Sequence, residues 1–75
     1  MSVQNKPQTL SNARKKIDQL SDATDHGDLL YRLGVASGWL AALCLEELIC
    51  RMTFSELCAE MNEAFREVGD TLEPN

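Results

Sequence analysis

Residues 33 to 45, L-G-V-A-S-G-W-L-A-A-L-C-L, are the most informative stretch of this chain. These thirteen residues carry no charge. In a helix, at about 100° per residue, the large side chains in and beside this stretch point in every direction. They form three faces: Leu33, Leu40 and Cys44; Leu30, Leu45 and Leu48; and Val35, Trp39 and Leu43. A helix that is apolar all round has to be covered on all sides.

The same helix has a smooth side formed by small residues. They fall within roughly one quadrant of the helix or slightly more: Gly34, Gly38, Ala41 and Ala42. Glycine inside a helix costs about 0.5–1 kcal/mol relative to alanine, so two of them indicate a packing reason. We favour a close helix crossing at a two-fold axis over close packing within one subunit or a local kink. The predicted self-association surface comprises Gly34, Gly38, Trp39, Leu40, Ala42 and Leu43.

A chain of 75 residues buries a limited fraction of its surface. Small proteins usually add disulfides, a metal ion or oligomerisation. The odd number of cysteines (Cys44, Cys50 and Cys58) and their apolar, helix-like surroundings argue against disulfides. His26 lies far from these cysteines in sequence and no C-x-x-C pair is present, so we expect buried thiols and no metal or cofactor. Oligomerisation remains, and we predict a homodimer.

The ends of the chain and its apolar stretch bear on its location. The first ten residues are polar and show no secretory signal, which favours a reduced, cytoplasmic setting. The thirteen uncharged residues are fewer than the roughly 20 that a membrane span needs. We therefore expect a cytoplasmic protein with no membrane partner.

The overall pattern predicts an all-α fold of three helices, with one helical domain over residues 9–72 between a flexible tail, 1–8, and a second tail, 73–75. The first helix should be short and capped by Thr9 or Ser11. Its apolar stripe is Leu10, Ala13, Ile17 and Leu20. Residues 21–27 are rich in turn formers, and Asp22, Thr24 or Asp25 are candidate caps for the second helix. Whether the chain turns sharply or only kinks there stays open.

The third helix carries a capping-box pattern, Thr53 to Glu56, with Met52 and Leu57 placed for a hydrophobic staple. This pattern predicts a break over residues 51–53 and an αα-hairpin with the second helix. Two such hairpins would pair as a dimeric helical bundle. We expect Gly69 to end or fray the helix. The apolar face of this helix comprises Phe54, Leu57, Cys58, Met61, Ala64, Phe65, Val68 and Leu72.

Charge divides the chain into a basic arm and an acidic body. The arm carries Arg14, Lys15 and Lys16, after Lys6, with no acid among residues 1–16. Opposite the apolar face of the third helix lies an acidic row: Glu56, Glu60, Glu63, Glu67 and Asp70. These carboxylates fall within about 80° of arc, with only Arg66 nearby in sequence. They predict either a solvated helix face or a partner-binding mimic of a nucleic-acid backbone.

The motifs point away from an enzyme. There is no nucleophile triad, no glycine-rich phosphate loop and no H-E-x-x-H; Asp25, His26 and Asp28 are the only close acid/base group, and a turn histidine is more often merely exposed. We expect a small acidic protein that acts by protein–protein binding, a regulator or inhibitor of an unidentified protein target. Its composition is shared by small regulatory proteins of phages and mobile elements, including inhibitors of host defence or nucleic-acid-processing complexes. The alternative is a small dimeric DNA-binding regulator that uses the basic first helix, although the acidic body opposes nucleic acid.

Overall fold

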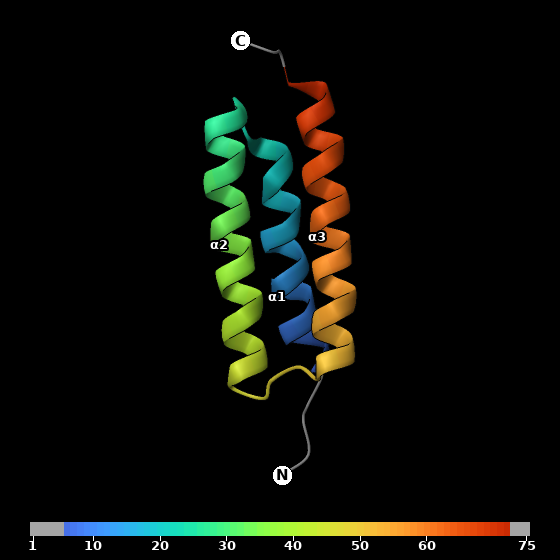
Figure 1. The fold of residues 1–75 in the computed structure, drawn as a ribbon. Coiled ribbons are helices and arrows are strands. Elements are labelled where there is room, and N and C mark those ends of the chain that lie inside the picture. The colour runs from blue at the N-terminus through green and yellow to red at the C-terminus, as the bar shows by residue number, and fades with distance from the viewer. Residues whose placement is uncertain (1–5, 73–75) are drawn as a thin grey trace.

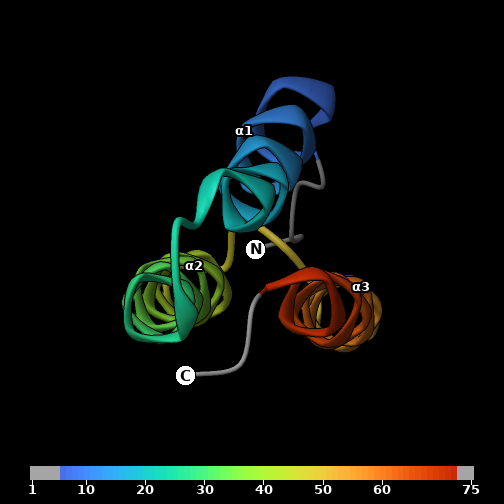
Figure 2. The same cartoon turned by 90° about the horizontal axis from the view of Figure 1, so that it is seen from above.

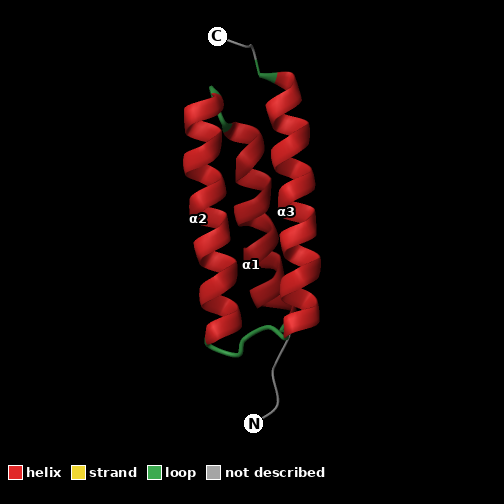
Figure 3. Ribbon diagram, viewed as in Figure 1, coloured by secondary structure: helices red, strands yellow, loops and turns green. Residues whose placement is uncertain are grey.

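The computed structural model describes residues 6–72, a range that contains α-helices and one short 3-10 helix but no strand. The elements are α1 (Pro7–Asp18), η1 (Gln19–Asp22), α2 (His26–Leu45) and α3 (Arg51–Thr71) (Figure 1). α2 runs in the opposite direction to α1 and α3, and the three helices occupy the corners of a triangle when seen end-on (Figure 2). Short loops join them (Figure 3). The prediction of an all-α fold with three helices is confirmed.

α1 begins earlier than the sequence predicted. Its first residue is Pro7, and no side chain caps it. Proline fits this position because its fixed φ suits a helix and its missing N–H has no partner in the first turn. The capping roles predicted for Thr9 and Ser11 are therefore wrong. The predicted tails lie mainly in residues 1–5 and 73–75, outside the described residues.

The chain turns sharply between α1 and α2, which settles the alternative that the sequence left open. η1 carries α1 on for one tight turn, and residues 23–25 then reverse the chain. Asp25 caps α2, since its carboxylate accepts a hydrogen bond from the N–H of Asp28 at 2.7 Å. Of the candidate caps, Asp25 is the one that the structure confirms.

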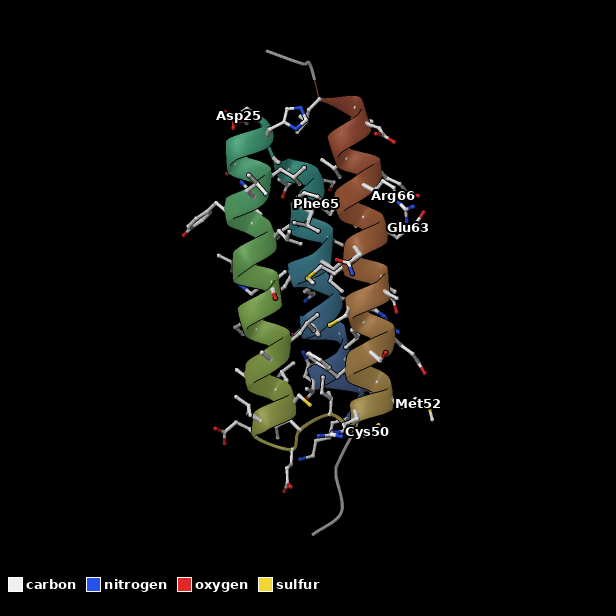
Figure 4. All side chains as sticks on the ribbon, in the orientation of Figure 1. Asp25, Cys50, Met52, Glu63, Phe65 and Arg66 are labelled. Atoms are coloured by element: carbon white, nitrogen blue, oxygen red, sulfur yellow. The ribbon has the colours of Figure 1, made fainter. Side chains whose placement is uncertain are left out.

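The core lies along the axis of the triangle and draws on every helix. The fully buried large side chains come from η1, α2, the second loop and α3: Leu20, Leu29, Leu40, Ile49 and Leu57. The predicted apolar faces of α1 and α3 are confirmed, because each of their members is buried or half-buried. Phe65, for example, points from α3 toward the other helices (Figure 4). Inside α3, Gly69 lies against Leu29, and the helix continues to Thr71 instead of ending at the glycine.

α2 ends in a hydrogen-bonded turn that the sequence did not signal. The N–H of Leu48 donates to the carbonyl of Leu43 at 2.9 Å, and the N–H of Glu47 donates to that of Cys44 at 3.1 Å. This pair of bonds is the Schellman motif, whose central residue is usually glycine. Here Glu47 occupies the left-handed position, with φ 59°. Because this position carries glutamate and not glycine, the residue type does not predict that the helix ends there.

α3 begins at Arg51, and its N-cap is Cys50. The Sγ atom of Cys50 accepts a hydrogen bond from the N–H of Thr53 at 3.5 Å. The predicted capping box on Thr53 and the predicted break over residues 51–53 are therefore wrong, because the turn after α2 starts α3 three residues sooner. Met52 is 72% exposed and points away from the bundle (Figure 4), so it forms no staple with the buried Leu57.

Candidate self-association surface

The side of α2 that faces away from α1 and α3 is apolar and exposed. Five large side chains on α2 remain partly or largely in solvent: Leu30 (60%), Tyr31 (71%), Val35 (40%), Trp39 (39%) and Leu45 (83%). Successive helix positions at about 100° place them around the half of the helix opposite the buried Ala36 and Leu40. Two helices of the same chain thus leave half of α2 uncovered.

Gly34 and Gly38 lie in the middle of this outer face. A Cβ atom added at either position would meet nothing within 4 Å among the described residues. The reading that these glycines allow close packing within one subunit is therefore wrong. Ala42 is also exposed and lies one helical turn further along. The three small residues form a shallow strip that the chain itself does not use.

One member of the predicted surface belongs to the core, and another lies at the edge of the core. Leu40 is 0% exposed, whereas Leu43 is half-buried and packs against the buried cluster. Assigning Leu40 to self-association was wrong, because α1 and α3 cover that side of α2. The sequence also missed Tyr31 and Leu45, which are more exposed than Trp39. Both residues lie on the same side of the helical wheel as the glycines, and this position could have predicted that they belong to the exposed surface.

The exposed apolar area is large for so small a chain. With side chains of roughly 150–250 Å² each, the five exposed fractions leave on the order of 500 Å² in solvent. The largest apolar patch on a typical monomer is about 300–600 Å² and often marks a binding surface. Two copies that buried this area against each other would remove about 1,000 Å², which is the lower end for a specific interface.

α1 forms one edge of this outer face. The Nζ atom of Lys16 lies 4.8 Å from the ring centroid of Trp39. A cation above an aromatic ring is attracted by the ring's negative face. Lys16, a member of the basic arm, is thus used within the chain and holds the indole at the border between α1 and α2.

The basic arm and the acidic row neutralise each other in part. The Nη2 atom of Arg14 lies 3.3 Å from a carboxylate oxygen of Glu60, so α1 contributes a positive charge to the row on α3. Glu63 pairs with Arg66 one turn along α3 (Figure 4). The expectation that only Arg66 lies near the row is therefore corrected. The five carboxylates all remain exposed.

The acidic start of α2 has a structural role that accounts for its residues. The carboxylate of Asp28 accepts a hydrogen bond from the N–H of Thr24 at 3.0 Å and another from Arg32 at 3.1 Å. These hydrogen bonds lower the pKa of Asp28 below its ordinary value, and the bond from Thr24 has the larger effect. Together with the cap by Asp25, they fix the entry of α2. His26 lies exposed at the first position of this helix.

The cysteine thiols are half-buried, where the sequence predicted buried ones. Burial and the neighbouring Cys44 raise the pKa of Cys58, which keeps its thiol protonated. Cys44 and Cys58 therefore act as small packing side chains between α2 and α3. Cys50 instead caps α3.

By length and composition alone, α2 is a helix that could cross a membrane. The helix as a whole spans 20 residues, longer than the thirteen uncharged residues that predicted no membrane span. One helix of this kind is weak evidence, but a mostly buried core helix does not explain it, because only 17% of its apolar stretch is buried. Comparison of the chain with protein-family models, with curated proteins and with solved structures gave no match. The outer face of α2 and the charged surfaces beside it are the features of the described chain that bear on function.

Proposed function

We propose that this protein acts by protein–protein binding, as a homodimer that joins through the outer face of α2. The observation that carries the proposal is that five exposed large apolar side chains surround two open glycines, and that residues 33–45 of this helix bear no charge. Water solvates such a face poorly, and burying apolar area is favourable by roughly 25 cal/mol per Å². The glycines allow a second backbone to approach closely enough for side chains on both sides to pack.

A second copy explains the glycines better than a lipid surface does. A face that inserts into a bilayer gains from bulky side chains, and glycine contributes almost no apolar area. Glycine does help when a second helix crosses closely, and this use offsets its cost of about 0.5–1 kcal/mol in a helix. The strip therefore favours a helix of the same shape as its partner.

The dimer would act as a regulator or inhibitor by contacting a protein target with its acidic row. In support of this proposal, the row lies on α3 and every carboxylate in it is exposed. Glu56, Glu67 and Asp70 make no ion pair within the described part of the chain, so they are available to pair with a basic surface.

Sedimentation equilibrium of the natural protein tests the assembly. We expect a monomer–dimer equilibrium as concentration rises from about 1 µM to about 1 mM. A protein that stays monomeric over this range contradicts the proposal. For the target, immobilised natural protein and a Glu56→Gln/Glu67→Gln/Asp70→Asn variant are compared for capture from the source cell. A partner that is held by both equally would exclude the acidic row.

A further inference from the structure

We infer that two copies pair through antiparallel α2 helices, with the two-fold axis at Gly38; this inference rests on the proposed function. The exposed strip is symmetric about that residue. Gly34 and Ala42 lie four positions before and after Gly38, and Tyr31 and Leu45 lie seven positions before and after it. An isologous interface needs such self-complementarity, because each contact occurs twice. Small residues then meet at the crossing and bulky ones flank it on both sides.

The helix dipoles and the two glutamates at the end of α2 favour one direction. The C-terminal end carries Glu46 and Glu47, both exposed, beside the negative end of the helix dipole. At the N-terminal end, Asp25 caps the helix, Asp28 is paired with Arg32, and the dipole is positive. A parallel pair would bring four glutamates and two negative dipole ends together. An antiparallel pair places each acidic end beside the positive end of the partner's helix dipole, which reduces the repulsion.

The antiparallel arrangement also determines where α1 and α3 lie in the dimer. α1 flanks α2 on the side of Trp39, where Lys16 contacts the indole, and α3 flanks it on another side (Figure 2). A two-fold axis perpendicular to the helices, lying in the plane of the interface, keeps each flank on its own side. Both α1 helices would therefore lie on one side of the dimer, and both α3 helices on the other.

Nuclear magnetic resonance on the natural protein tests this inference without any substitution. A 1:1 mixture of isotope-labelled and unlabelled chains reports only the through-space contacts that join two copies. Within one chain Tyr31 and Leu45 are 14 positions apart on α2, about 21 Å along the axis, so they cannot contact each other. We expect contacts between the ring protons of Tyr31 and the methyl protons of Leu45 from different copies.

The outcomes separate the two proposals. A dimer with contacts from Tyr31 to Tyr31 and from Leu45 to Leu45 overturns the antiparallel arrangement and leaves self-association through α2 intact. Contacts between copies that involve α3 and no residue of the outer face of α2 overturn both. A sample with no contacts between copies at millimolar concentration overturns the proposed function itself. The Tyr31–Leu45 contact supports both.

Discussion

Replacing Gly38 with leucine should change the stability of the single chain and its self-association in opposite directions. Within one chain the new side chain has open space, because a Cβ at Gly38 meets nothing within 4 Å among the described residues. Leucine is a better helix former than glycine by about 0.8 kcal/mol, so the monomer should gain that much. For a domain of this size, the gain corresponds to a rise of about 3–6 °C in Tm.

In the dimer the same leucine would stand at the crossing point of the two α2 helices. Overpacking a close contact costs about 1–3 kcal/mol, and the two-fold axis brings in both copies, giving about 2–6 kcal/mol. The dissociation constant should rise by roughly 30-fold to more than 10⁴-fold. Sedimentation equilibrium measures this effect, and urea unfolding below the dissociation constant measures the monomer.

Ala59→Leu supplies the matched control for Gly38→Leu. It adds the same side chain at an exposed position of α3, away from the glycine strip. Association of this variant should match that of the natural protein. Unchanged association of Gly38→Leu would refute the assignment of the interface, and a less stable monomer would refute the claim that the site is open.

Three further predictions concern packing, the end of α2 and pH. Leu57→Ala should cost about 2–5 kcal/mol in urea unfolding because Leu57 is fully buried, whereas Leu45→Ala, at a site 83% exposed, should leave the monomer unchanged and weaken association. Glu47→Asn should stabilise the chain by about 0.5–1 kcal/mol, since asparagine adopts the left-handed conformation more easily, and Glu46→Asn, where φ is −83°, should not. The folded state lowers the pKa of Asp28. The stabilisation of the fold by the Asp28 carboxylate is therefore complete above the ordinary pKa of about 3.9 and is lost as the pH falls through the lower folded pKa. The loss of unfolding free energy between pH 7 and pH 2 should consequently be smaller in Asp28→Asn than in the natural protein.

Local patterns in the sequence identified much of the fold. The spacing of Ala13, Ile17 and Leu20, and the continuous apolar face of α3, predicted which sides of these helices are buried. Helix boundaries were less predictable. Pro7 opens α1 without a side-chain cap, and Glu47 takes a left-handed conformation that its residue type does not favour. The first depends on the fixed φ of proline, and the second on the hydrogen bonds of the turn that ends α2.

Residue type and helical period are enough to show that this chain is helical and that α2 has more apolar surface than a short partner can cover. Which half of α2 stays exposed depends on how the other two helices pack against it. α1 and α3 approach from one side, which buries Leu40 and leaves Tyr31, Gly38 and Leu45 in solvent. The tertiary structure also decides that Arg14 faces Glu60, residues far apart in sequence. The spacing of apolar residues predicts how wide the apolar face of a helix is. Which part of that face is buried depends on the helices that pack against it.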